Sequence, residues 1–325
     1  MTGEAPPLRP FETWASASTM RSRVVLEIAA ELVGADDQPL RQARVLLRHQ
    51  GSDGWPLALH AGSTLEAIKQ VVSGTAQLSM VNPAAILTLA YRGTGPFSAP
   101  QPVRVIGVIP SLDQFVFAVR ATSPLERFED IGRLHYPLKA SVRDQPDHCI
   151  HMMLDHVMAA AGFSGADVIG WGGAFRNEVR PRAPRFVAYD SGAVDAIFDE
   201  AVDEWGDAGL ERGLKFLPLA EETIVRLEAM GYRRGVIRAE TLAGLKADVP
   251  TVDFSGWPIY VHADLPDRLV EQICAALDAR KHLIPWQGEG PLPVERMCRD
   301  AADTPLDVPL HPAAEKFWRA QGYLS

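Results

Sequence analysis

The stretch from Gly62 to Gly93 constrains the fold most, because it combines two helix starts with one short apolar strand. Residues 63–66, Ser-Thr-Leu-Glu, have the pattern of a capping box, which predicts a helix that ends at Ser73–Gly74. Residues 76–81 predict a buried strand, and Asn82–Pro83 predicts the N-cap and first turn of a second helix. Such an arrangement directs unpaired backbone N–H groups to the carboxyl edge of a parallel sheet. Open α/β folds bind small, often anionic, ligands at that edge.

Length and charge limit the possible classes of protein. A chain of 325 residues suits two α/β lobes, because a single hydrophobic core stops growing at about 250–300 residues. The net charge of −9, with no block of Lys or Arg, argues against nucleic acid as a partner. No run of residues approaches the roughly 18 apolar residues that a membrane span needs, so we expect no direct insertion into a membrane.

The cysteines and the N-terminus bear on the compartment. Cys149, Cys274 and Cys298 are widely spaced and include no CxxC pair, so the sequence predicts neither a disulfide framework nor a zinc ribbon. Residues 1–10 contain prolines and lack the basic and apolar regions of a signal peptide. We therefore expect a cytoplasmic protein for the sequence as written, and a periplasmic one if a leader has been removed.

Strand and helix signals alternate along the rest of the chain, which predicts parallel βαβ units. Residues 50–61 are predicted to be a loop. Strands are predicted at residues 11–17, 43–49, 103–110, 115–120, 138–142, 168–171, 186–189, 193–198, 214–217 and 257–261. Helices are predicted at residues 20–33, capped by Ser18–Thr19, and at 123–131, 147–161, 266–280 and 312–322.

Several of these segments resemble a known family. The chain is similar to the type II periplasmic binding proteins, and most similar to the TAXI branch of TRAP-transporter solute receptors. The N-terminal part of the likeness consists of Ser-Gly-Thr-Ala-Gln-Leu-Ser-Met-Val-Asn at 73–82, Val-Phe-Ala-Val-Arg at 116–120 and Phe-Glu-Asp-Ile at 128–131. The C-terminal part consists of Val-Pro-Thr-Val at 249–252, Ile-Tyr-Val-His-Ala-Asp-Leu-Pro at 259–266 and Val-Pro-Leu-His-Pro-Ala-Ala-Glu at 308–315.

The resemblance implies a fold and a function. It implies an α/β protein of two lobes, each a mainly parallel sheet flanked by helices, with residues 1–118 and 256–325 in the first lobe and 119–255 in the second. Two crossing strands join the lobes, and a ligand cleft lies between them. The implied function is a solute-binding protein that closes around a small organic acid, either a carboxylate or an amino-acid-like ligand. A membrane transporter subunit is the implied partner, and we expect no cofactor.

The implied cleft lies where strand ends and helix starts of both lobes converge. Candidate ligand-binding residues from the first lobe are Ser16, Ser18, Thr19, Gly62, Ser63 and Asn82, and those from the second lobe are Arg143, Asp144 and His148. Arg143 is the preferred partner for a ligand carboxylate, because a guanidinium offers a planar bidentate fork.

Each candidate also has a purely structural interpretation. Ser18, Ser63 and Asn82 are typical helix caps whether or not a ligand is bound. Arg143 suits a surface salt bridge equally well. Trp55, in the predicted loop, either covers the ligand or packs its own loop down.

A second hypothesis is a cytosolic enzyme on the same scaffold, such as a decarboxylase of an aromatic carboxylate. His148, with Asp147 or Asp144, could then act as the acid or base. His148, His151 and Asp155 share one helical face, a spacing that can also bind a metal, yet no HExxH motif is present and we expect no metal site.

Two acidic pairs remain outside these motifs. Asp199–Glu200 and Asp203–Glu204 are predicted to form the solvated face of one helix. A role at the hinge or cleft is the alternative.

Overall fold

The computed structural model of the protein describes residues 16–33, 42–48, 56–178 and 183–325. The chain forms two compact units, Met1–Ala43 and Arg44–Ser325. The first unit contains helix α1 (Ser16–Val33). Ser16 and Ala17 are therefore helical, and the prediction that they end a strand over 11–17 is wrong for these two residues. Neither is β-branched or aromatic, and the helix of residues 20–33 extends back through them.

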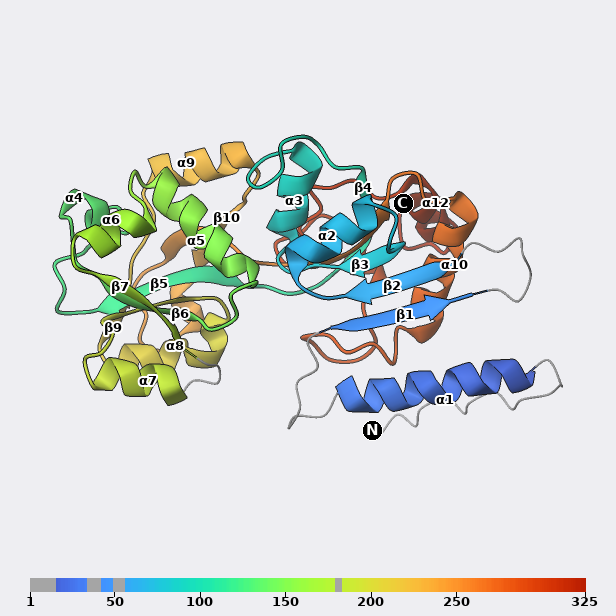
Figure 1. Ribbon diagram of the computed structural model, residues 1–325, viewed down its shortest axis with the longest axis horizontal. Coiled ribbons are helices and arrows are strands. Elements are labelled where there is room, and N and C mark those ends of the chain that lie inside the picture. The colour runs from blue at the N-terminus through green and yellow to red at the C-terminus, as the bar shows by residue number, and fades with distance from the viewer. Residues whose placement is uncertain (1–15, 34–41, 49–55, 179–182) are drawn as a thin grey trace. The chain divides into compact units, whose positions relative to one another are not determined.

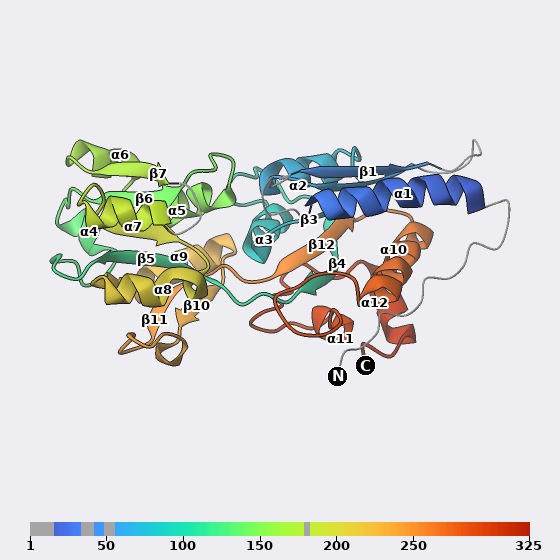
Figure 2. The ribbon, with the colours of Figure 1, turned by 90° about the horizontal axis from the view of Figure 1, so that it is seen from below.

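The first sheet of the larger unit has the order β1-β2-β3-β12-β4, of which Figure 1 labels β1 to β4 and Figure 2 labels β12. Its strands are β1 (Ala43–Leu47), β2 (Leu57–Ala61), β3 (Leu78–Met80), β4 (Val103–Ile109) and β12 (Trp257–His262). Strand β2 corrects the predicted loop over residues 50–61: Ala58 and His60 alternate with more exposed neighbours, which is the period of a half-buried strand. Strands β2 and β3 are parallel, whereas β12 runs antiparallel to both β3 and β4.

Helices cover both faces of the first sheet (Figure 2). One face holds α2 (Thr64–Val72) and α3 (Ala84–Arg92), and the opposite face holds α10 (Asp267–Arg280), α11 (Val294–Met297) and α12 (Pro312–Ala320). Strand β4 contributes side chains to both faces. Val105 and Val108 enter the core formed with α2 and α3, whereas Ile106 and Ile109 enter the core formed with the helices of the opposite face.

The second sheet has the order β10-β11-β5-β8-β6-β7, and β9 also pairs with β5. Its strands are β5 (Gln114–Arg120), β6 (Lys139–Arg143), β7 (Ala174–Glu178), β8 (Ala196–Asp199), β9 (Leu214–Phe216), β10 (Arg234–Ile237) and β11 (Val249–Asp253). Strand β6 is parallel to both β7 and β8, whereas β5 is antiparallel to β8. Both sheets are thus mixed rather than mainly parallel, because β12 in the first sheet and β5 in the second run antiparallel to their neighbours.

The chain crosses between the sheets twice. It leaves the first sheet between Ile109 and Gln114 and returns between Asp253 and Trp257. Residue 118, the predicted end of the first lobe, therefore lies inside β5 of the second sheet. The predicted return at residues 255–256 lies within the second crossing.

Two predicted strands of the second half are helices. Its helices are α4 (Asp130–Arg133), α5 (Cys149–Ala160), α6 (Gly165–Gly170), α7 (Ala183–Asp190), α8 (Val202–Glu211), α9 (Glu221–Met230) and a 3₁₀ turn, η1 (Ala239–Thr241). Residues 168–171 belong mainly to α6, which a capping box between Ser164 and Asp167 opens. Residues 186–189 belong to α7. A four-residue apolar run does not distinguish a strand from a buried helix turn, and here the helix signals prevailed.

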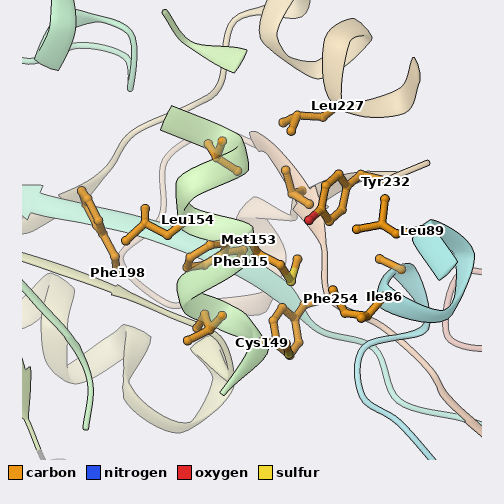
Figure 3. Close-up of a cluster of buried hydrophobic side chains, with 14 of the residues drawn as sticks. Ile86, Leu89, Phe115, Cys149, Met153, Leu154, Phe198, Leu227, Tyr232 and Phe254 are labelled. Carbon is orange, nitrogen blue, oxygen red and sulfur yellow. The ribbon is translucent and has the colours of Figure 1, made fainter. Parts of the chain in front are cut away.

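One hydrophobic core joins helices of both halves. Figure 3 shows Ile86 and Leu89 of α3 and Cys149 and Met153 of α5 in the same cluster as Phe254 of the second crossing. All of these side chains are buried. The core therefore runs from the helices of the first sheet to those of the second without interruption.

Phe117 lies at the centre of the part of this core that covers the second sheet. Its ring centroid is 4.4 Å from that of Phe128, and the side chain is 1% exposed. We expect Phe117→Ala to lower the free energy of unfolding by about 3–5 kcal/mol, because the cavity cannot collapse fully. Leu112→Ala, at a side chain that is 64% exposed, should change it by less than about 0.5 kcal/mol. Urea denaturation measures both, and equal losses would contradict the assignment of Phe117 to the core.

Candidate functional site

Four buried charged side chains gather at the carboxyl edge of β6 and β8; we call Arg143, Arg185, Asp199 and Glu200 the charged cluster. Each is at most 6% exposed. Arg143 Nη2 and Nε lie 2.9 Å and 3.3 Å from Asp199 Oδ1, and Nη2 also pairs with Glu200. Arg185, in the first turn of α7, pairs through Nη1 with Asp199 Oδ2. One carboxylate therefore joins two guanidinium groups inside the protein.

Strand geometry explains why these side chains meet. On β6, Ala140 and Val142 enter the core on the α5 side, so Ser141 and Arg143 point to the face that α7 and α8 cover. The same alternation on the parallel strand β8 places Asp199 on that face. Because parallel strands end at the same edge of a sheet, the last residues of β6 and β8 are brought together there.

The first crossing adds a further carboxyl group. Asp113 accepts hydrogen bonds from the backbone N–H groups of Ala201, at 2.9 Å, and Gln114, at 2.7 Å. Burial raises the pKa of Asp113 well above its usual value, and the contact with the Glu200 carboxylate raises it further. The two neighbouring carboxyl groups therefore favour holding one proton between them over both being ionised.

The charged cluster corrects two structural interpretations. Asp199 and Glu200 do not lie on the solvated face of a helix, because Asp199 ends a buried strand and its arginine partner lies 56 residues earlier in the chain. Arg143 is buried, so the interpretation as a surface salt bridge is also wrong. Its proposed contact with a ligand carboxylate stays a prediction.

The starts of three helices meet at the backbone of Asn82. Its carbonyl oxygen lies 3.2 Å from the Thr64 hydroxyl at the start of α2 and 3.3 Å from the Cys149 thiol at the start of α5. Asn82 itself precedes α3 and joins Pro83 through a cis peptide bond. The N-cap of α3 is Pro83 rather than Asn82, and the side chain of Ser63 makes no capping hydrogen bond. The prediction that Asn82 caps α3 is thus wrong, whereas Ser63 holds the predicted N-cap position of α2 without the predicted side-chain hydrogen bond.

His148 connects the start of α5 with the charged cluster. Its Nδ1 accepts the backbone N–H of Ile150 at 3.3 Å, so the side chain caps the helix. Its Nε2 lies 3.1 Å from Arg143 Nη1. The imidazole ring also stacks parallel to Phe254, with 6.5 Å between the ring centroids. These contacts join α5, β6 and the second crossing at one place.

The other candidate residues are less closely tied to this place. Gly62 packs against His60, because a Cβ at residue 62 would lie 2.7 Å from His60 Nε2. Asp144 is half-buried and Asp147 is exposed. Trp55 lies outside the described residues. Ser16, Ser18 and Thr19 belong to α1 in the other compact unit, and their role in ligand binding stays a prediction.

The histidines of α5 have protein partners. His151 Nε2 lies 2.9 Å from the carbonyl oxygen of Gln145, and His156 Nδ1 lies 2.7 Å from the hydroxyl of Tyr232. Across residues 16–33, 42–48, 56–178 and 183–325, no three His, Cys, Asp or Glu side chains are grouped so that they could hold a metal ion. The burial of Cys149 raises the pKa of its thiol to about 12, so this cysteine is a poor nucleophile at neutral pH.

Three residues of this region were not among the sequence-based candidates: Asp113, Arg185 and Phe254. Asp113 follows the predicted strand 103–110, so its place after a strand end was a usable signal. Arg185 precedes residues that were predicted to be a strand, and nothing local indicates its contact with Asp199. A cavity of about 710 Å³ between α8, β9 and residues 243–249 contains none of the candidate residues.

Comparison with known proteins assigns the family. A model of the NMT1-like family matches residues 57–322. The chain belongs to the NMT1-like family. No curated protein matches its sequence. Within the part of the chain that the structure describes, no helix is both long and apolar enough to cross a membrane.

Solved structures resemble the chain only remotely. The periplasmic aliphatic sulphonate binding protein SsuA from Escherichia coli is 13% identical, with 66% of this chain and 55% of that chain covered and a TM-score of 0.33. The glycine betaine/L-proline-binding protein ProX from Borrelia burgdorferi is 10% identical, with 62% of each chain covered and a TM-score of 0.33. XAC2383 from Xanthomonas citri, bound to ATP, is 12% identical, with 82% and 86% covered and a TM-score of 0.37. The matched part thus spans little more than half of SsuA, and none of these comparisons singles out the TAXI branch.

Ser255 ties the two crossings together beside the charged cluster. Its hydroxyl accepts the backbone N–H of Asp113 at 3.0 Å and lies 2.5 Å from Asp253 Oδ1. Burial raises the pKa of Asp253 to about 7. A protonated carboxyl group therefore lies at the end of β11, where the second crossing begins, at mildly acidic pH.

This carboxyl group makes stability depend on pH. The folded protein binds the Asp253 proton more tightly than the unfolded chain does. Proton binding therefore stabilises the folded state fully below about pH 4, and this stabilisation is lost as the pH rises towards 7. We expect Asp253→Asn to remove this dependence. The free energy of unfolding of the variant minus that of the wild type should rise between pH 4.5 and 7, at most by about 1.4 kcal/mol per pH unit.

Urea denaturation at several pH values measures this difference. Asp264→Asn is the matched control, because the Asp264 side chain is 90% exposed. A difference for Asp253→Asn that stays flat from pH 4.5 to 7 would show that the Asp253 carboxyl group is not protonated in the folded protein.

Proposed function

We propose that this NMT1-like chain is a solute-binding protein of the TAXI type, which closes two lobes around a small organic acid. The ligand is a carboxylate or an amino-acid-like molecule. It binds at the carboxyl edge of β6 and β8, where the first half of the chain meets the second. The two sheets and the two crossings between them support a hinged pair of lobes.

The meeting of three helix starts at Asn82 is the observation that carries the proposal. Helices α2 and α3 pack on the first sheet and α5 packs on the second, yet Thr64 and Cys149 both approach the same carbonyl oxygen. Helix N-termini carry unpaired N–H groups and the positive end of the helix dipole, so they favour an anion. A site between the two sheets near this point would receive such groups from both halves.

The nearby charges also suit an acidic ligand. Arg143 and Arg185 contribute two permanent positive charges, which Asp199 shares. The raised pKa of Asp113 beside Glu200 favours a proton on this pair, which lowers its negative charge. With that proton, the total charge of the two arginines and the three carboxyl groups is close to zero. A ligand carboxylate meets less repulsion there than the acidic side chains alone would suggest.

Transport is the biological role that fits this proposal. SsuA is a periplasmic binding protein, and ProX is named as part of an ABC transporter. Under the proposal, the present chain acts in the periplasm and delivers its ligand to a membrane transporter subunit. The contacts of His148 favour this role over catalysis, because helix capping and the proximity of Arg143 occupy both ring nitrogens.

The proposal predicts that binding depends on the ligand's negative charge. We expect at least one of succinate, aspartate and benzoate to raise the melting temperature by about 5 °C or more at a hundredfold excess over its Kd. The matching amide, in which a carboxamide replaces the carboxylate, should give a much smaller shift. Thermal denaturation followed by calorimetric titration measures both effects.

Recovery of the ligand distinguishes a receptor from an enzyme. After overnight incubation with the protein, the acid should be recovered unchanged by mass spectrometry. Release of carbon dioxide or any other conversion would favour the decarboxylase hypothesis. Equal shifts with acid and amide would show that the site does not select an anion.

A further inference from the structure

Arg185 has an unusual hydrogen-bonding state for a buried arginine. Its side chain is about 4% exposed, and its Nη1 pairs with Asp199. Its Nε and Nη2 are inaccessible to solvent and have no hydrogen-bond partner among the described residues. Buried donors of a charged group are costly when they are left without an acceptor.

The two unpaired nitrogens form one functional unit. In a guanidinium group, Nε and Nη2 lie on the same edge of the plane, and their N–H bonds are nearly parallel. This edge matches the two oxygens of a carboxylate, which can accept both hydrogen bonds at once. Arg185 therefore presents a complete bidentate fork, while its other end is fixed by Asp199.

Arg143 lacks such an edge. Its Nε and Nη2 bind Asp199, Nη2 also pairs with Glu200, and Nη1 lies 3.1 Å from His148. A ligand carboxylate could accept two hydrogen bonds from one edge of Arg143 only by displacing one of these partners. Four of the five N–H donors of Arg143, the arginine favoured by the sequence, thus already have partners, whereas Arg185 keeps a whole edge unpaired.

A second unpaired polar group lies on the same face of the sheet. Ser141 is fully buried, and its hydroxyl has no hydrogen-bond partner within the described part of the chain. It precedes Arg143 by two residues on β6, so both side chains point towards α7. An acceptor beneath α7 would therefore find both a guanidinium edge and a hydroxyl donor.

We propose that Arg185, rather than Arg143, is the residue that binds the acidic group of the ligand, through Nε and Nη2. This inference rests on the proposed function, because it specifies which side chain of the proposed receptor contacts the acid. Arg143 is then a positioning residue that holds Asp199 in place. Since the fork is inaccessible in this conformation, the acid reaches it only when the edge of the sheet rearranges, which couples binding to a change of conformation.

The test compares two variants that differ only in which arginine is changed. Arg185→Gln removes the fork but leaves Asp199 paired with Arg143. Its matched control is Arg176→Gln, because Arg176 lies on the neighbouring strand β7 and is exposed. Calorimetric titration with succinate, aspartate and benzoate gives the affinity, and thermal denaturation shows that each variant is folded.

We expect Arg185→Gln to lower the affinity for the acid that the wild type binds by about 100-fold, because two charge-assisted hydrogen bonds are lost. Discrimination between that acid and its amide should disappear. Arg176→Gln should retain both the affinity and the discrimination. Arg185→Lys keeps the charge without the fork and should lose about tenfold in affinity; it also serves as the test if Arg185→Gln does not fold.

Each outcome decides one of the two proposals. If the wild type binds an acid in preference to its amide and Arg185→Gln does so equally well, the assignment of Arg185 is wrong while the proposed function stands. If the wild type binds none of the three acids, the proposed function fails, and the assignment of Arg185 fails with it. Loss of discrimination in Arg185→Gln alone supports both.

Discussion

The carboxyl edge of the second sheet depends on two buried ion pairs, which Asp199 makes with Arg143 and with Arg185. A carboxylate that is fully removed from water needs strong partners, because the cost of desolvating an unpaired charge is several kcal/mol. Its two oxygens bind different arginines, one at the end of β6 and one in the first turn of α7. The positions of β6, β8 and α7 at this edge are therefore linked, and displacing any one of them leaves a buried charge unpaired.

The crossings between the sheets are linked to the same ion pairs. Asp113 in the first crossing contacts Glu200, the residue that follows Asp199, and Ser255 in the second crossing accepts the backbone N–H of Asp113. His148 adds a contact from α5 to Arg143 and stacks on Phe254. Because of these contacts, a change in the path of either crossing alters the environment of the charged cluster. The two crossings between the sheets thus lie beside the buried charged cluster.

Local signals predicted those parts of the fold that local contacts form. The segment from Gly62 to Gly93 contains α2, β3 and α3 almost where glycine, proline and apolar spacing placed them. Residues 168–171 and 186–189 were misassigned because short apolar runs suit strand and helix equally. The charged cluster could not be predicted, since Arg143 meets Asp199 across 56 residues and only strand register brings them together. Sequence reasoning named both Arg143 and His148, which the structure brings within 3.1 Å of each other, but could not tell that Arg143 was already paired.

The contrast between the two arginines matters for how a buried charge can serve binding. A guanidinium such as that of Arg143, with a partner already on each of its nitrogens, gains little from a new anion, because a two-hydrogen-bond contact replaces existing hydrogen bonds. Arg185 has already lost its hydration, and Asp199 holds the side chain in place. An acceptor for Nε and Nη2 would therefore displace no existing hydrogen bond, and little conformational entropy would be lost in ordering the side chain. The cost of the unpaired donors falls instead on the folded state without ligand. An anion that binds the fork stabilises the rearranged conformation in which the fork is accessible, and such a difference in affinity is what allows a ligand to shift a conformational equilibrium.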